Sequence, residues 1–212
     1  MTSDAFKRSL KTHQEKGFFK NLTILRGIER ESLRVTQKGQ ISQNNHPKNL
    51  GSPLTSKDIT TDFAEALVEL VTPTFESAEE LYKHLSLLHK FLYSELGEEM
   101  LWNFSMPCAF QNEQEIRIAE YGDTNSGMLK HIYRKGLRLR YGSIMQCVSG
   151  IHYNFSLSKD SWNSLSNDPD QDFINKKYLG IIRNIKRNFW FILERLGASP
   201  IDRRRRRRCA VT

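Results

Sequence analysis

The stretch GIERESLRV at residues 27–35 carries two glutamates, Glu29 and Glu31, in a run that is otherwise typical of a β-strand. Because alternate residues of a strand share a face, both carboxylates are expected to point to the same side. A second stretch, TTDFAEALVELVT at residues 60–72, contains three further acidic residues: Asp62, Glu65 and Glu69. A charged carboxylate in apolar surroundings is costly unless a cation or several donors compensate it. The two stretches therefore predict a site for a multiply charged cation such as Mg²⁺.

The second stretch can be read in two ways. As a strand, it places Glu65 and Glu69 on one face and Asp62 on the other, unless a β-bulge brings Asp62 to the shared side. As a helix over residues 58–72, it places all three on one face. The alanines favour a helix, whereas the VELVT ending and the following Pro73 favour a strand, so the sequence leaves both states open.

Length and composition indicate a soluble globular protein. The 212 residues suffice for one substantial core, and no apolar run approaches the roughly 18 residues that a membrane span needs. Residues 1–16 form a charged amphipathic segment rather than a signal peptide, so we expect a cytoplasmic protein without a membrane partner. Three widely spaced cysteines indicate neither a disulfide framework nor a zinc site, and we expect Cys108 and Cys147 to be buried thiols.

The positive charge of the chain is concentrated at its end. Six of the net eight positive charges lie in Arg203–Arg208, which leaves a net charge of +2 for the rest. Such a block is expected to be disordered, and it could bind nucleic acid or an acidic surface. The alternative, which we favour, is an abnormal chain end, because nothing in the preceding segment prepares for a tail.

The rest of the pattern alternates helices and strands without repeats or an internal linker, which predicts an α+β fold. Helices are expected over four segments: residues 4–16, 76–96, 126–141 and 170–196. Strands are expected over residues 22–36 and 144–157. Ser77 and Glu80 fit a capping box at the start of the second helix. In the last strand, His152 and Asn154 face the same way.

Oxygen-rich sites of this kind suit Mg²⁺, which completes its shell with water and substrate phosphates. A nucleotide-dependent transfer reaction therefore fits this set of acidic and imidazole side chains. Each residue also has a structural alternative. The glutamates could be surface carboxylates paired with Arg30 or Arg34. Taken alone, His152 would more often be a core histidine, and Tyr133 and Arg134 would be helix-surface residues.

Six motifs in order resemble the glutamate–cysteine ligases of the proteobacterial type. They are RGIERESLR at 26–34, ITTDFAEALVE at 59–69, NFSMPC at 103–108, YGDTNSG at 121–127, YRKGLRLRYG at 133–142 and SGIHYNFSL at 149–157. The resemblance runs from about residue 20 to GASP at 197–200, which is nearly the whole chain.

The resemblance implies part of a glutamine-synthetase-like catalytic fold, in which a curved antiparallel sheet flanked by helices forms a funnel for metal ions and ATP. The implied reaction joins the γ-carboxylate of L-glutamate to L-cysteine through a γ-glutamyl phosphate, the first step of glutathione biosynthesis. The implied cofactor is Mg²⁺, with Mn²⁺ as the alternative, and ATP is the co-substrate. A complete family member is expected to be a monomer.

Carried over position by position, the resemblance assigns five residues to the metal-binding wall: Glu29, Glu31, Asp62, Glu69 and His152. It places Phe63 and Tyr133 near the cysteine substrate, and Arg134 near the reacting carboxylate or phosphate. The chemistry needs cations where two anions meet, and it needs no covalent nucleophile of the enzyme.

The chain departs from the family after GASP, where IDRRRRRRCAVT at 201–212 replaces further strands of a much longer chain. We therefore predict the N-terminal part of a ligase catalytic domain at 1–200, followed by an atypical tail, with the chain inactive alone and poorly stable. Two alternatives remain: another Mg²⁺-dependent enzyme, such as a nuclease or a different carboxylate–amine ligase, and a protein that binds nucleic acid through its arginine tail.

Overall fold

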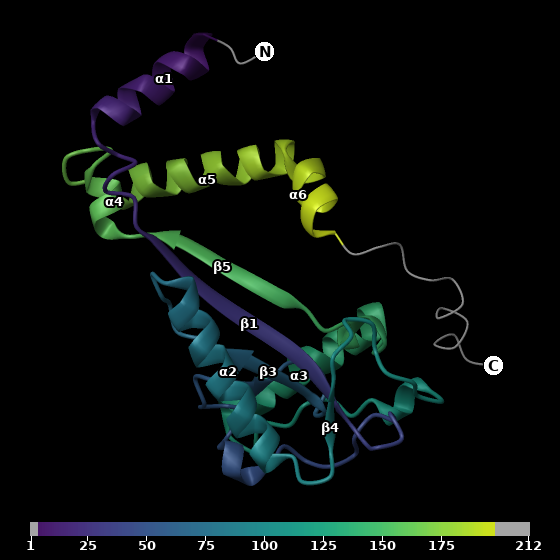
Figure 1. Ribbon diagram of the computed structural model, residues 1–212. Helices are drawn as coiled ribbons and strands as arrows, with labels where there is room; N and C mark the ends of the chain where they lie inside the picture. Colours follow the sequence, from purple (N-terminus) through teal and green to yellow (C-terminus); the bar gives the residue numbers. More distant parts are fainter. Residues whose placement is uncertain (1–3, 198–212) are drawn as a thin grey trace. The chain divides into compact units, whose positions relative to one another are not determined.

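The computed structural model describes residues 4–197, and these divide into two compact units (Figure 1). The first unit consists of residues 4–25 and 155–197, and the second of Arg26–Asn154. The predicted arginine-rich tail at residues 201–212 lies outside the described residues. The division into a ligase-like part at 1–200 and a separate tail therefore stays a prediction.

An antiparallel sheet forms the frame of the second unit. Its strands are β1 (Ile24–Val35), β2 (Ile59–Thr61), β3 (Leu67–Val71), β4 (Met100–Trp102) and β5 (Ile151–Leu157). Four strands follow the order β2-β3-β1-β4, and β5 also pairs with β1. The strand β1 lies between β3 and β5 (Figure 1). Its Glu31 is opposite Glu69 of β3 and donates its amide to the carbonyl of Gly150, just before β5 (3.1 Å). Helices and an antiparallel sheet confirm the predicted α+β class.

The segment whose state the sequence left open, residues 59–71, forms a β-hairpin. β2 and β3 pair with Thr60 opposite Glu69. The pairing continues one residue beyond β2, where the amide of Asp62 donates to the carbonyl of Leu67 (3.0 Å), so strand alternation places Asp62 on the Glu69 face and no bulge is needed. The helix alternative is wrong, because the two alanines that favoured it are buried in and beside the hairpin turn.

The helix α2 (Ala78–Glu95) covers one face of the sheet. Its Leu92 is fully buried and belongs to the same apolar cluster as Val68 and Leu70 of β3. The side chain of Ser77 accepts a hydrogen bond from the amide three residues on (3.3 Å), which confirms the predicted start of this helix. Val68 and Leu70 alternate with Glu69, so this core lies on the face opposite to the acidic residues.

The helix α3 (Asn125–Tyr141) belongs to the other face. Its Leu137 packs against a second core cluster that includes Leu33 of β1 and Leu67 of β3. Along β1, the residues on this face are two glutamates followed by Leu33 and Val35. One side of a single strand is therefore acidic at one end and part of the core at the other.

The last strand of the second unit begins later than predicted. The expected strand over 144–157 is replaced at its start by a short 3₁₀ helix, η3 (Met145–Cys147), and β5 begins only at Ile151. Two further 3₁₀ helices lie in loops: η1 (Lys48–Leu50) and η2 (Glu113–Glu115). Cys108 and Cys147 are both buried, as predicted, and burial raises the pKa of Cys147 to about 12.

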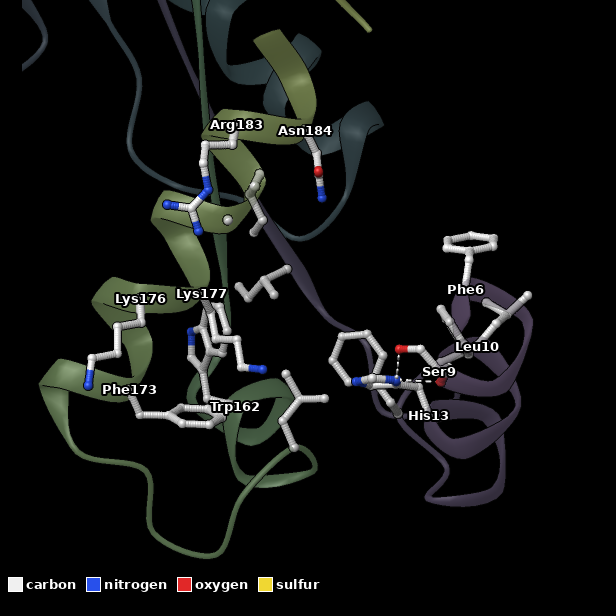
Figure 2. A pocket seen from close by; sticks show the side chains of 16 residues that line it. Phe6, Ser9, Leu10, His13, Trp162, Phe173, Lys176, Lys177, Arg183 and Asn184 are labelled. Carbon is white, nitrogen blue, oxygen red and sulfur yellow. Dashed lines mark hydrogen bonds between the residues drawn. The ribbon is translucent and has the colours of Figure 1, made fainter. Parts of the chain in front are cut away.

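The first unit is helical apart from the strand ends that enter it. Its helices are α1 (Asp4–Glu15), α4 (Lys159–Asn163), α5 (Gln171–Arg187) and α6 (Phe189–Leu196). The long C-terminal helix that the sequence predicted is thus broken at Asn188. Residues of α1 and α5 line an open cavity of about 750 Å³, with Phe6 and Leu10 on one side and Phe173 and Lys177 on the other (Figure 2).

None of the predicted site residues lines this cavity. Within residues 4–197, no helix is long and apolar enough to cross a membrane.

Candidate metal centre

Two neighbouring strands bring the predicted carboxylates together. Glu29 and Glu31 share a face of β1, and the sheet register sets Glu31 directly opposite Glu69. Like charges in directly opposite positions of a sheet are destabilising unless something compensates them. The arrangement therefore requires a proton or a cation between the strands.

The strand β5 adds an imidazole and an amide to this face. His152 Nδ1 lies 3.0 Å from Glu29 Oε2, and Asn154 Nδ2 donates to Glu29 Oε1 at 2.8 Å. His152 Nε2 lies 3.9 Å from Glu31 Oε1. The amide of Gly150 donates to the other oxygen of Glu31 at 2.7 Å. The prediction that His152 and Asn154 face the same way is confirmed.

These contacts shift the pKa values of Glu29 and His152 in opposite directions. Hydrogen bonds from Asn154 and then His152 hold the pKa of Glu29 below its usual range. The hydrogen bond to Glu29, with the nearby carboxylates, raises the pKa of His152. The side chain of His152 is 54% exposed, so it is not the core histidine that its apolar surroundings in the sequence allowed.

Glu69 is in a different state. Burial, followed by the charges of Asp62, Glu31 and Glu29, raises the pKa of Glu69 to about 7. Among the described residues, no arginine or lysine forms an ion pair with Glu69. The alternative pairing with Arg30 or Arg34 is therefore wrong for this carboxylate.

The two arginines have other partners. Arg34 is fully buried and pairs with Glu99 at 2.7 Å, and Arg30 donates to the main-chain carbonyl of Glu31. Within residues 4–197, neither arginine forms an ion pair with Glu29 or Glu31 either. Within the described residues, the ion pairs of Glu29 and Glu31 are therefore formed with His152 alone, when it is protonated.

The donor set fits a divalent cation. Glu29, Glu69 and His152 each offer one ligand atom, and these atoms lie within 4.8 Å of one another. Two carboxylates suit Mg²⁺ or Mn²⁺, whereas an imidazole ligand is more typical of transition metals than of Mg²⁺. Glu31 and Asp62, also predicted as ligands, lie outside this group, but their charges act on Glu69.

Arg134 lies beside Asp62 at the edge of this face. Its Nε donates to the carbonyl of Asp62 at 2.5 Å, and its Nη2 lies 3.9 Å from the Asp62 carboxylate. The guanidinium also stacks over the ring of Tyr121, 4.7 Å from the ring centre. Because the Tyr121 hydroxyl donates to the carbonyls of Thr61 (2.7 Å) and Asp62 (3.0 Å), one buried tyrosine positions both the arginine and the end of β2.

The two residues predicted to contact substrate lie in opposite environments. Tyr133 is 63% exposed on α3, where a ligand can reach it. Phe63 is 1% exposed and packs in the core cluster beneath the hairpin, so it shapes the site through packing in this structure. Their substrate contacts stay predictions.

Glu65 does not lie beside Glu69 as the strand pattern predicted. It lies in the turn between β2 and β3, 4% exposed, and its two oxygens accept the amides of His46 and Glu120, each at 2.8 Å. The prediction fails because period-two alternation holds only within a strand, and the chain reverses between Asp62 and Leu67.

The sequence analysis assigned no role in the site to three participants: Asn154, the amide of Gly150, and Tyr121. The strand pattern had placed Asn154 on the His152 face, and that position was the signal for its role. The Gly150 amide and Tyr121 act through main-chain contacts between distant segments, and no residue-type signal in the sequence marks them.

Comparison with known proteins gives a consistent set of matches. The model of a family described as glutamate-cysteine ligase matches residues 8–206. A glutamate–cysteine ligase of Pseudomonas putida strain W619 is 49% identical over 181 residues, which are 83% of this chain and 34% of the relative. That of Pseudomonas syringae pv. syringae is 46% identical with the same coverage. The chain thus spans about a third of the length of the curated relatives it matches.

Two solved structures are also similar. A glutamate–cysteine ligase of Francisella tularensis, in complex with AMP, has a TM-score of 0.72 at 40% identity, covering 80% of this chain and 34% of that one. A bifunctional glutathione synthetase of Pasteurella multocida has a TM-score of 0.77 at 35% identity, covering 90% and 25%.

Proposed function

Because this chain belongs to the glutamate–cysteine ligase family, we propose that it supplies the metal-binding part of a site that joins L-glutamate to L-cysteine with cleavage of ATP. The observation that carries the proposal is the convergence of Glu29, Glu69 and His152 from three strands within 4.8 Å. The proposed location is the cytoplasm.

The reaction explains why such a site is needed. Transfer of the γ-phosphoryl group of ATP to the γ-carboxylate of glutamate brings two anions together. A divalent cation, Mg²⁺ or Mn²⁺, held by Glu29, Glu69 and His152 would neutralise this charge and align the groups. The cysteine amine then attacks the acyl phosphate and displaces inorganic phosphate, so the enzyme needs no nucleophile of its own.

The protonation states of Glu29, Glu69 and His152 determine whether these residues can bind a cation. Asn154 and His152 keep Glu29 ionised, so this ligand needs no deprotonation. Glu69 holds a proton below about pH 7 in the absence of metal, and it must lose that proton to bind one. His152 must likewise be neutral to offer a ligand nitrogen. Its contact with Glu29 favours the protonated imidazole, so a cation would have to displace that proton.

Arg134 is proposed to bind the reacting carboxylate or phosphate. Its Nε and Nη1 are committed to the carbonyls of Asp62 and Lys130, while Nη2 faces the Asp62 carboxylate across 3.9 Å. This leaves donor capacity on Nη2, which supports a role in binding an anion. Tyr133, exposed on the same helix, is proposed to contact the cysteine substrate.

We further propose that the chain alone does not catalyse the reaction. It offers three clustered ligands, whereas Mg²⁺ takes about six and binds with substrate phosphates. It also spans only 34% of its ligase relatives.

The test uses a fusion of this chain with the part of the P. putida W619 ligase that it does not match. We expect the fusion to form γ-glutamylcysteine and ADP only when both amino acids are present. Glu29→Gln and Glu69→Gln should each lower kcat/KM by at least about 100-fold, since both remove a ligand that aligns the phosphates. Glu120→Gln, on an exposed side chain paired with Arg117, is the matched control and should retain activity.

A fusion in which Glu69→Gln is as active as the parent would overturn the assignment. Ligase activity of the unfused chain that Glu29→Gln abolishes would show instead that the site is complete within these 212 residues.

A further inference from the structure

Two cations of the helix α3 lie over the ring of one tyrosine, Tyr121. The guanidinium of Arg134 lies 4.7 Å from the ring centre, and the ammonium nitrogen of Lys130 lies 5.0 Å from it. Like charges four residues apart on a helix repel each other, whereas the π face of an aromatic ring attracts each of them. The tyrosine therefore holds two positive charges together at the edge of the acidic face.

The position of Tyr121 relative to this helix is fixed by its surroundings. Its side chain is 4% exposed, and its hydroxyl donates to two carbonyls at the end of β2. The start of the helix approaches so closely at Gly127 that a Cβ there would lie 2.5 Å from the Tyr121 carbonyl oxygen. His131 Nδ1, one turn on, lies 2.8 Å from the carbonyl of Ala119. The ring cannot move away from its two cations without disturbing these contacts.

The two cations have little compensation from carboxylates. Within residues 4–197, Lys130 forms no ion pair, and Arg134 forms one, with Asp62 at 3.9 Å. That distance is too long for a hydrogen bond. Lys130 is also exposed, so a ligand can reach it. An anion could therefore bind here without displacing a hydrogen-bonded carboxylate.

Arg134 cannot present a free pair of donors to such an anion by itself. A guanidinium binds a carboxylate or phosphate through two neighbouring nitrogens, either Nη1 with Nη2 or Nε with Nη2. Nε already donates to the carbonyl of Asp62 and Nη1 to that of Lys130, so each pair contains a committed nitrogen. A second donor for a two-oxygen anion must come from another residue, and the ammonium group of Lys130 lies over the same ring.

We propose that Lys130 is the second cation of the anion site at Arg134, and that Tyr121 positions both. The anion is a group with at least two terminal oxygens, which a carboxylate of an amino-acid substrate and a phosphate of the nucleotide both provide. The choice of these two sources rests on the proposed function. Lys130 donates a charge-assisted hydrogen bond to one oxygen, and Nη2 of Arg134 donates to another.

The first measurement uses this chain with its lysines dimethylated by carbon-13 formaldehyde, which keeps their charge and makes them visible by NMR. We expect the Lys130 signal, identified by its loss in Lys130→Arg, to be shifted upfield by the ring relative to that of Lys135, which is exposed on the same helix. Tyr121→Phe should keep this shift, and Tyr121→Leu should abolish it. Inorganic phosphate at millimolar concentration should move the Lys130 signal but not that of Lys135, and should move it less in Arg134→Met.

The second measurement uses the fusion with the P. putida W619 sequence and identifies the anion. Lys130→Met should raise one KM about tenfold and change kcat less than about twofold, because it removes one charge-assisted hydrogen bond made to the bound substrate. A higher KM for ATP assigns the site to a phosphate, and a higher KM for either amino acid assigns it to a carboxylate. Lys130→Arg should restore most of the affinity, and Lys135→Met is the matched control.

A loss of structure is separated from a loss of binding. Circular dichroism of Tyr121→Leu shows whether this variant of a buried residue is folded. The Lys130 variants change an exposed side chain, so they test the proposal whether or not Tyr121→Leu folds.

The outcomes distinguish this inference from the proposed function. A Lys130 signal that phosphate moves in an Arg134-dependent way, in a chain whose fusion makes no γ-glutamylcysteine, supports the anion site and contradicts the function. An active fusion in which Lys130→Met leaves all three KM values unchanged overturns the anion site alone. A Lys130 signal that phosphate leaves in place, or moves together with that of Lys135, also overturns it.

Discussion

Glu65 and Glu69 lie four residues apart in one hairpin, and their carboxylates have opposite environments. Glu65 is 4% exposed, and both of its oxygens accept main-chain amides from distant loops. Glu69 is half-buried among three other carboxylates, and its pKa is raised to about 7. A buried carboxylate with its donors in place stabilises the fold, whereas one crowded by like charges is suited to binding a cation.

The largest expected effect is the loss of stability when Glu65 is replaced. Glu65→Ala leaves the amides of His46 and Glu120 without their acceptor, and it should lower the free energy of unfolding by about 3 kcal/mol. Urea unfolding followed by circular dichroism measures the change. Glu115→Ala removes a carboxylate that also accepts an amide, that of Gln111, but at an exposed site. This control should cost less than about 1 kcal/mol, and equal losses would show that burial does not distinguish the two glutamates.

A second prediction concerns the cation. Mn²⁺ at about 100 times its dissociation constant should raise the free energy of unfolding of the parent chain by about 2.7 kcal/mol. In Glu69→Gln, where we expect affinity to fall at least about tenfold, the same Mn²⁺ concentration should stabilise by about 1.4 kcal/mol or less. Thermal unfolding with and without Mn²⁺ measures both. Equal stabilisation of parent and variant would mean that the ion binds elsewhere.

The smallest expected effect is on the metal-free chain. At pH 8, Glu69→Gln should stabilise by about 1 kcal/mol, allowing for solvent screening at this half-buried position, because it removes a carboxylate that is charged among like charges. The pKa of Glu69 is about 7 in the folded chain against 4.5 ordinarily, so the folded state holds the extra proton. Its contribution to stability is full below about pH 4.5 and is lost as the pH rises to about 7.

The raised pKa of His152 acts in the same direction, since its proton is also held more tightly in the folded chain. Urea unfolding at several pH values should therefore show a gain for Glu69→Gln over the parent that grows between pH 4.5 and 7. A gain that is the same at pH 4.5 and pH 8 would contradict a titrating Glu69.

These two glutamates also show how far the sequence leads. Local patterns predicted β1, α2 and α3, because each has its own periodicity and caps. The hairpin at 59–71 stayed ambiguous because its turn contains none of the usual turn residues. It contains alanines and Phe63, which are buried by tertiary packing. Nothing local separates Glu65 from Glu69, because the donors that satisfy Glu65 come from residues 46 and 120.

For the candidate site, the alternation along β1 and β5 predicted which residues share a face. Their convergence depends on the pairing of three strands. The sequence spacing did not predict that convergence; the family resemblance implied it. The break in the last helix at Asn188 and the late start of β5 at Ile151 had no clear local signal either.

The most direct test of the central claim, that Glu69 gives up a proton to a cation held with Glu29 and His152, is calorimetric titration of Mn²⁺ at pH 6 in buffers of different ionisation enthalpy. With a pKa near 7, Glu69 is mostly protonated at this pH. The parent should release about one more proton per bound Mn²⁺ than Glu69→Gln does. Equal proton release and equal affinity in the two proteins would contradict the account.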